Sequence, residues 1–180
     1  MHKLNIITPC TRPQNLEKIS KSIKIPRENY CWIVVFDSET IPKEIPDNCE
    51  AYAIKVKKSA MGNGQRNYAL EMIKDGHVYF NDDDTTVHPD LWNQVKNLSA
   101  DIITFSQANK DGSIRLMGNL IRNNHVDSHN FIVNRKIIGE LRWILNRYDA
   151  DGIFIEECAK QTKDIKFIPK ILSIYNALRV

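Results

Sequence analysis

Short apolar runs alternate along the chain with segments in which apolar residues recur at helical spacing. The run at 4–8 is followed by Leu16, Ile19 and Ile23, which lie on one face of a predicted helix. The run at 31–36 is nearly continuous and rich in β-branched residues, as expected for a strand that is covered on both faces. This alternation of strand and helix predicts an α/β fold with a mostly parallel sheet.

The same pattern predicts the remaining elements. Further strands are expected at 51–56, 78–80, 101–105, 130–133 and 171–175, and further helices at 66–73, 91–98 and 152–161. In an open sheet of this type, ligands bind beyond the carboxyl ends of the strands. Polar residues that directly follow a strand are therefore the first candidates for a functional site.

Three consecutive acids, Asp82, Asp83 and Asp84, follow the predicted strand at 78–80. Carboxylates placed this close together repel one another unless a cation lies between them. Mg²⁺ and Mn²⁺ prefer oxygen ligands of this kind and commonly hold phosphate groups. The cluster therefore predicts a metal site that binds phosphates.

Two other kinds of loop also contain acids. A solvated turn, or the cap of the helix that begins near 89–92, favours aspartate, and this interpretation stays open. A calcium-binding EF-hand loop needs a glycine and a glutamate at the positions that Val87 and Asn93 occupy. The sequence therefore excludes the EF-hand loop and leaves a metal site or a turn.

Composition narrows the class of protein. The 180 residues suit one compact domain, and the net charge of +3 is too small to indicate nucleic-acid binding. No apolar run approaches the roughly 20 residues that a membrane span needs, and the N-terminus lacks the apolar segment of a signal peptide. The four cysteines are scattered, without zinc-site spacing. We therefore expect a cytoplasmic chain, either complete or a domain of a larger protein.

Several motifs occur in an order typical of one enzyme family. Thr8-Pro9 and Arg12-Pro13 come first, then Asp37, then Gly62-x-Gly64-x-Arg66-Asn67, and finally the acid cluster. In this order the motifs resemble those of the GT-A nucleotide-sugar glycosyltransferases, and of inverting family 2 in particular, in which the acids form the DxD motif. The resemblance covers about residues 4–158.

The resemblance implies a single GT-A domain, with a nucleotide-binding half at about 1–86 and an acceptor half at about 87–180. It implies a Mn²⁺- or Mg²⁺-dependent enzyme that moves a hexose from a nucleoside diphosphate, most often UDP, to a hydroxyl group with inversion. The acceptor hydroxyl would belong to a glycan, a protein or a lipid.

The family pattern also implies roles for the donor-site residues. Asp84 is the expected closest metal ligand, Asp82 binds the metal directly or through water, and Asp83 faces the donor ribose or sugar. Asp37 would contact the base or ribose, unless it caps a turn, and Arg66 would contact phosphates or base, unless it is a surface arginine. The other residues expected at the nucleotide are Thr8, Pro9, Arg12 and Asn67.

In the acceptor half, Asp127 and His129 match residues near the donor sugar. His129 is either a third metal ligand or part of a polar network. Asp151 is the predicted general base, because inversion needs a carboxylate that takes the acceptor proton opposite the diphosphate. A helix cap explains Asp151 equally well. Asp149 and Glu156 are the alternative bases.

Two alternative functions stay open. A sugar-nucleotide nucleotidyltransferase shares the α/β layout, but it normally carries a glycine-rich loop after the first strand, and residues 8–13 contain no glycine. A non-catalytic module that binds a nucleotide sugar would keep the pocket and lack a working base. Metal-dependent nucleotide binding without turnover would identify the second alternative.

Overall fold

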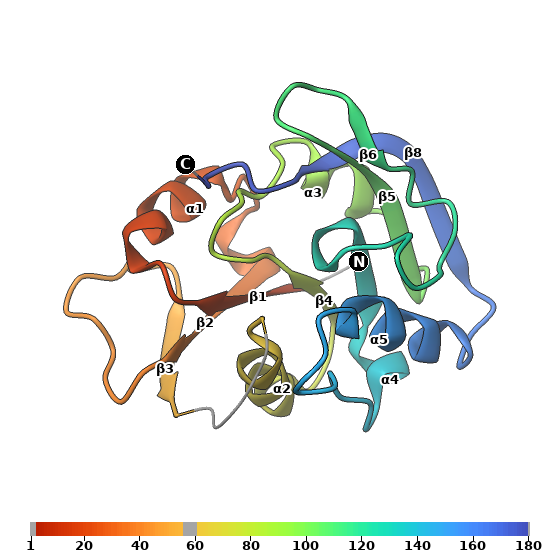
Figure 1. The fold of residues 1–180 in the computed structure, drawn as a ribbon. Helices are drawn as coiled ribbons and strands as arrows, with labels where there is room; N and C mark the ends of the chain where they lie inside the picture. Colours follow the sequence, from red (N-terminus) through yellow and green to blue (C-terminus); the bar gives the residue numbers. More distant parts are fainter. Residues whose placement is uncertain (1–2, 56–60, 180) are drawn as a thin grey trace.

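A computed structural model of the chain describes residues 3–55 and 61–179. An eight-stranded sheet runs through the whole molecule (Figure 1). Its strands, in spatial order, are β3 (Glu50–Ile54), β2 (Tyr30–Asp37), β1 (Leu4–Cys10), β4 (His77–Phe80), β7 (Phe131–Asn134), β5 (Ile102–Ala108) and β6 (Ile114–Leu116), while β8 (Ile165–Ile174) pairs with β5.

The first four strands of this order are parallel. Ile7 of β1 lies opposite Ile33 of β2 and Phe80 of β4, and β3 pairs with β2 in the same direction. The β4–β7, β7–β5 and β5–β6 pairs are antiparallel, and β8 runs parallel to β5. The carboxyl ends of β1, β2 and β4 therefore meet at one edge of the sheet.

Helices cover both faces of the sheet (Figure 1). One core lies under α1 (Leu16–Ser22) and α3 (Leu91–Val95). The other lies under α2 (Asn63–Met72), α4 (Arg135–Ile138) and α5 (Ala150–Ala159). Short 3-10 turns occur at Pro13–Asn15, Arg27–Asn29 and Ser128–Asn130. In the described part of the chain, no helix has the length and apolar character that crossing a membrane requires.

The predicted architecture is confirmed, and most predicted elements lie where the pattern placed them. The strand expected at 51–56 is observed as β3, and Val56 lies outside the described residues. The largest difference is β8, which begins at Ile165, six residues before the predicted start. Lys166, Pro169 and Lys170 interrupt its apolar pattern, as is typical of an edge strand. The short elements β6 and α4 were not predicted.

Candidate active site

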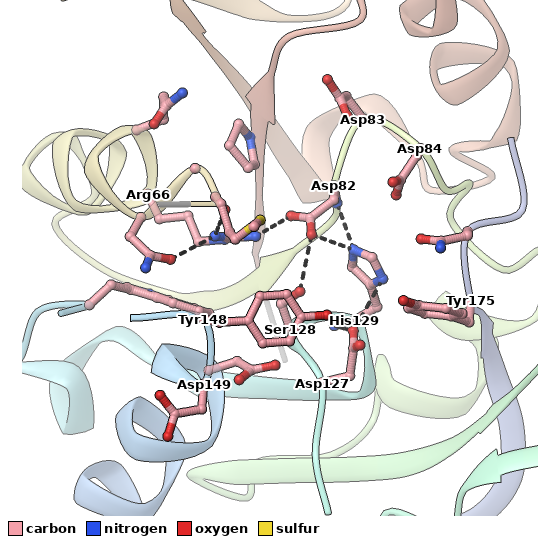
Figure 2. A pocket seen from close by; sticks show the side chains of 18 of the residues that line it. Arg66, Asp82, Asp83, Asp84, Asp127, Ser128, His129, Tyr148, Asp149 and Tyr175 are labelled. Carbon is pink, nitrogen blue, oxygen red and sulfur yellow. Dashed lines mark hydrogen bonds and ion pairs between the residues drawn. The ribbon is translucent and has the colours of Figure 1, made fainter. Parts of the chain in front are cut away.

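A cavity of about 540 Å³ opens where β1, β2 and β4 end (Figure 2). Loops before η3, the 3-10 turn at Ser128–Asn130, and before α5 supply the opposite walls, and the segment after β8 supplies another. The predicted site residues that line the cavity are Pro9, Arg12, Asp37, Arg66, Asp82, Asp83, Asp84, Asp127, His129, Asp149 and Asp151. The structure thus brings together residues up to 142 positions apart, since both Pro9 and Asp151 line the cavity.

Asp82 is held by three side chains. Its Oδ1 lies 2.5 Å from Nη2 of Arg66, and its Oδ2 accepts a hydrogen bond from Ser128 Oγ at 3.3 Å. Oδ2 also lies 3.2 Å from Nε2 of His129. Burial alone would raise the pKa of the Asp82 carboxyl, but Arg66 and His129 outweigh burial and hold the pKa below its ordinary value. Asp82 is therefore ionised throughout the physiological pH range.

Arg66 lies inside the molecule, so the interpretation as a surface arginine is wrong. Its residue exposure is 3%, and its guanidinium lies 4.5 Å from the ring centre of Trp143. Nη1 donates to the carbonyl of Met61 at 2.6 Å and to Asn63 Oδ1 at 3.1 Å. Arg66 therefore joins the start of α2 to the acid cluster. A direct contact between Arg66 and phosphates or base stays a prediction.

His129 lies buried between two carboxylates (Figure 2). Its Nδ1 is 3.3 Å from Asp127 Oδ1, and its Nε2 accepts the backbone N–H of Asp82 at 2.9 Å. Burial lowers the pKa of the imidazole, but Asp82 and Asp127 outweigh burial and raise it. The Asp82 amide opposes this rise, because a ring that accepts at Nε2 carries its proton on Nδ1. The structure thus places His129 in a polar network, and its role as a third metal ligand stays a prediction.

The Asp83 carboxylate is turned toward the loop that follows β1. Oδ2 accepts the backbone N–H groups of Thr11 and Arg12 at 2.6 and 2.7 Å, and the Arg12 guanidinium lies 2.5 Å from Oδ1. We predicted that Asp83 faces the donor ribose or sugar. In the structure its two oxygens instead hold Thr11 and Arg12 at the edge of the cavity, because the backbone N–H groups after β1 point at them.

Asp84 is the member of the cluster with the fewest partners among the described residues. Arg12 Nη1 lies 3.6 Å from its Oδ2, beyond hydrogen-bonding distance. Burial and the nearby Asp82 carboxylate raise the pKa of Asp84. With exposures of 3% for Asp83 and 8% for Asp84, the cluster is not a solvated turn.

The acid cluster can supply part of a metal shell. Within 3–55 and 61–179, no group of three or more His, Cys, Asp or Glu side chains is arranged to hold a metal ion. Mg²⁺ and Mn²⁺ at phosphate sites commonly use one or two protein carboxylates, with phosphate oxygens and water completing the shell. The Asp84 carboxylate, with hard oxygen donors and no close side-chain partner among the described residues, fits that requirement, and Asp82 lies beside it.

Three acids are carried by α5 and its N-cap, and they differ in their partners. Asp149 pairs with Arg147 at 2.6 Å and accepts from Asn123 Nδ2 at 2.8 Å. Glu156 accepts the backbone N–H of Asn123 at 2.8 Å. Asp151 accepts only the backbone N–H of Gly152, at 2.8 Å, in the hydrogen bonds recorded among the described residues.

The Asp151 carboxyl has a pKa raised to about 6. Burial is the main cause, and the nearby carboxylates of Asp127 and Asp82 add to it. The N-cap of α5 is Asp149, which makes no side-chain capping bond, while Asp151 lies one residue inside the helix. Asp151 thus bonds within the first turn and also lines the cavity.

Thr8 and Asn67 do not line the cavity, in contrast to our prediction. Thr8 is fully buried in β1, and its hydroxyl accepts from Trp32 Nε1 at 2.9 Å. Side chains alternate along a strand, so the next residue, Pro9, reaches the cavity instead. Asn67 exchanges two hydrogen bonds with the backbone of Trp143, at 2.8 and 2.9 Å. Asn67 therefore fixes the loop before α5 against α2.

The turn before α2 depends on Gly62. Its φ of +79° is in the left-handed region, and a Cβ on this residue would lie 2.6 Å from Pro9 Cβ. Only glycine meets both conditions without displacing Pro9. Gly62 of the predicted motif is therefore a packing requirement at the cavity wall.

Several residues that were not predicted as site residues also line the cavity, among them Arg115, Tyr148, Tyr175, Asn176 and Arg179. Arg115 pairs with Asp127 at 3.0 Å and lies 3.8 Å from the ring centre of Tyr175. Each of these residues stands alone in a loop or at a strand end. No local motif in the sequence marks them. Arg115, Tyr175 and Arg179 are brought to the cavity by the pairing of β5 with β6 and β8, and Tyr148 by the loop before α5.

Solved structures with the same architecture are known, although the sequence matches no family model and no curated protein. The crystal structure of residues 1–349 of TarS from S. aureus matches with a TM-score of 0.76 and 14% identity, over 96% of this chain and 60% of that one. TarS has also been solved with UDP-GlcNAc, and that structure matches with a TM-score of 0.72 and 12% identity, over 96% of this chain and 58% of that one.

Two further structures belong to other proteins. The mannosyltransferase PcManGT from Pyrobaculum calidifontis, in complex with GDP-Man and Mn²⁺, matches with a TM-score of 0.72 and 15% identity, over 97% of this chain and 56% of that one. The bifunctional IspDF from Campylobacter jejuni matches with a TM-score of 0.58 and 15% identity, over 96% of this chain and 52% of that one. This chain spans about 60% of the TarS fragment. Its fold is that of the GT-A glycosyltransferases.

Proposed function

We propose that this chain is a metal-dependent glycosyltransferase that moves a hexose from a nucleoside diphosphate, UDP in the first instance, to a hydroxyl acceptor with inversion. The observation that carries the proposal is the placement of Asp151. A carboxyl group with a raised pKa and one backbone partner lines the same cavity as the acid cluster at the end of β4. The acid cluster and Asp151 come from different walls of that cavity. A donor held at the acid cluster and an acceptor held at Asp151 could therefore meet between them.

The donor would lie along the strand ends. Asp37, at the end of β2, and Pro9, beside Gly62, line the part of the cavity suited to a nucleoside. Asp37 offers carboxylate oxygens to a base N–H or a ribose hydroxyl. Asp83 positions Arg12 at the same edge. This arrangement supports a nucleotide in the crevice beyond the strands, where sheets of this type bind ligands.

The diphosphate would lie at Asp84. When bound there, Mn²⁺ or Mg²⁺ supplies positive charge that stabilises the departing diphosphate. Asp84 and Asp82 are the residues that would hold the ion, and Arg66 and His129 fix Asp82 in place. The Mn²⁺ in the complex of the structurally similar PcManGT supports this expectation.

Asp151 would take the proton of the acceptor hydroxyl. As the acceptor oxygen bonds to the anomeric carbon, the bond from that carbon to the diphosphate oxygen breaks, and the diphosphate leaves with the electron pair. A pKa of about 6 leaves Asp151 mainly ionised at neutral pH and more basic than an ordinary carboxylate. Asp149 and Glu156 are less suited, because Arg147 and Asn123 already occupy their oxygens.

Nucleotide binding and turnover test this proposal separately. Calorimetric titration with UDP and with GDP, with Mn²⁺ present and then chelated, is expected to give binding that needs the metal. A screen of UDP- and GDP-sugars with mixed glycan acceptors is then expected to release the nucleoside diphosphate, with NMR of the product giving the anomeric configuration. Failure to bind any nucleoside diphosphate would overturn the proposal. Binding without turnover would instead favour the non-catalytic module.

A further inference from the structure

The chain returns to the acid cluster after β8. The backbone N–H of Leu178 donates to the carbonyl of Asp84 at 2.7 Å, and Thr85 Oγ1 donates to the carbonyl of Ile174 at 2.6 Å. Leu178 also packs against the core beneath α1. We call residues 175–179 the C-terminal segment. These contacts fix the segment directly beside the predicted metal ligand Asp84.

The C-terminal segment lines the cavity. Tyr175 lies across from Asp82 and His129 in Figure 2, with the guanidinium of Arg115 3.8 Å from its ring centre. Arg179 also lines the cavity, and its backbone is held at both ends, since its N–H donates to Asn176 and its carbonyl accepts from Lys110 Nζ. The segment thus presents a positively charged side chain near the acids on a backbone that is already anchored.

The arginines around the cavity differ in their partners. Arg12 lies 2.5 Å from Asp83, Arg66 lies 2.5 Å from Asp82, and Arg115 lies 3.0 Å from Asp127. Arg179 makes no ion pair with any residue in 3–55 or 61–179. It is therefore the lining arginine whose charge is not already opposed by a carboxylate in the part of the chain that the structure describes.

The overall charge of the cavity indicates which ligand this arginine serves. The acidic lining residues are Asp37, Asp82, Asp83, Asp84, Asp127, Asp149 and Asp151, and the arginines are Arg12, Arg66, Arg115 and Arg179. The described lining is therefore net negative, and a diphosphate would be repelled from it without added positive charge. A cation at Asp84 would offset part of this negative charge, and Arg179 supplies a second positive charge on the adjacent segment.

We propose that Arg179 binds the diphosphate of the nucleotide donor, opposite Asp84, and so makes the C-terminal segment a wall of the donor site. This inference rests on the proposed function. A guanidinium forms paired hydrogen bonds to phosphate oxygens, a geometry that a single ammonium cannot reproduce. The backbone bond from Leu178 to Asp84 fixes the main chain of the C-terminal segment beside the acid cluster.

The test compares UDP with uridine, which lacks both phosphates, in the presence of Mn²⁺. Calorimetry for UDP and ligand-observed NMR titration for uridine are measured on the wild-type chain and on Arg179→Ala, Arg179→Lys and Arg122→Ala. Arg122 is an exposed arginine outside the cavity lining and serves as the matched control. Arg179→Ala is expected to weaken UDP binding by roughly tenfold to a hundredfold and to leave uridine unchanged. Arg179→Lys restores part of the loss.

Each outcome of these titrations either supports or overturns the assignment of Arg179 to the diphosphate. Equal loss for UDP and uridine would mean a general disturbance of the pocket, and an unchanged UDP affinity in Arg179→Ala would also overturn the inference while the proposed function stands. An unchanged UDP affinity with a raised KM for an anionic acceptor would assign Arg179 to the acceptor instead. If the wild-type chain binds no nucleoside diphosphate, both proposals fail. Because Arg179 is exposed, we expect unchanged thermal melting in all variants.

Discussion

The backbone N–H of Asp82 donates to Nε2 of His129 at 2.9 Å, so the imidazole holds the main chain of the acid cluster. The opposite ring nitrogen faces Asp127 at 3.3 Å. His129 therefore connects the end of β4 to the loop before β7. Positioning of the metal-binding acids depends on this contact in the proposed function.

Replacement of His129 by alanine is expected to destabilise the protein by about 3 kcal/mol, because it leaves buried polar groups without partners. His129→Gln should recover part of the loss, since the glutamine carbonyl can accept the Asp82 N–H. Urea denaturation measures both changes. His125→Ala, at an exposed histidine of the same loop, is the control and should stay within about 0.5 kcal/mol of wild type. Equal stability of His129→Ala and wild type would contradict the assigned role.

Replacement of Asp84 by asparagine is expected to abolish Mn²⁺-dependent nucleotide binding and to leave the fold intact. The neighbouring carboxylates and burial raise the pKa of Asp84, so its charge is unfavourable in the metal-free protein. The free energy of unfolding without metal should therefore be unchanged or slightly higher in the variant. Calorimetry and urea denaturation on the same samples test both statements. Retention of full metal-dependent binding would remove Asp84 as a ligand.

Asp151→Asn should bind the donor with nearly wild-type affinity and lower kcat by a factor of roughly 10² to 10⁴. The wild-type rate should fall as the pH drops through about 6, because protonated Asp151 cannot accept a proton. Steady-state kinetics from about pH 5 to about pH 8 measure the dependence of the rate on pH. A parallel loss of donor affinity in Asp151→Asn would indicate a structural role in α5.

The same carboxyl gives a stability prediction with a defined sign. A pKa of about 6 in the folded state lies above that of the unfolded chain, so the carboxyl favours folding when protonated and loses this contribution as the pH rises toward 6. Asp151→Asn should therefore be more stable than wild type at neutral pH, by up to about 3 kcal/mol, and equal to it near pH 4. Urea denaturation at the two pH values provides the comparison, and the reverse order would refute the assigned shift.

Arg66→Met should be destabilising, by about 1–3 kcal/mol, because it leaves the partly buried carboxylate of Asp82 without its main partner. The double variant Arg66→Met with Asp82→Asn should be more stable than Arg66→Met alone. A double-mutant cycle from urea denaturation measures this coupling. Additive effects of the two substitutions would show that the ion pair has no special contribution.

Local patterns in the sequence predicted the framework of the site and some of its residues. Apolar runs located β1, β2 and β4, and the acids directly after β4 do line the cavity. The direction of individual side chains was harder to predict. Thr8 was assigned to the pocket from its motif, yet strand alternation turns it to the core and brings Pro9 to the cavity.

Long-range pairing explains the lining residues that the sequence did not indicate. Tyr175 and Arg179 follow β8, whose place beside β5 is set by a parallel pairing between segments about 60 residues apart in sequence, as in Ile102 opposite Ile165. The sequence around them contains no motif for phosphate or sugar. Similarly, the partners of Asp83 are backbone N–H groups, and a backbone group has no sequence signature.

Asn123 contacts two of the three acids of α5 and its N-cap, Asp149 through its side chain and Glu156 through its backbone. The oxygens of Asp151 accept no hydrogen bond from Asn123. Asn123 and Arg147 thereby leave Asp151 as the carboxylate that would be available to an acceptor in the proposed function. In the proposed function, the availability of Asp151 as the base is therefore a property of the neighbouring loop as much as of the helix that carries it.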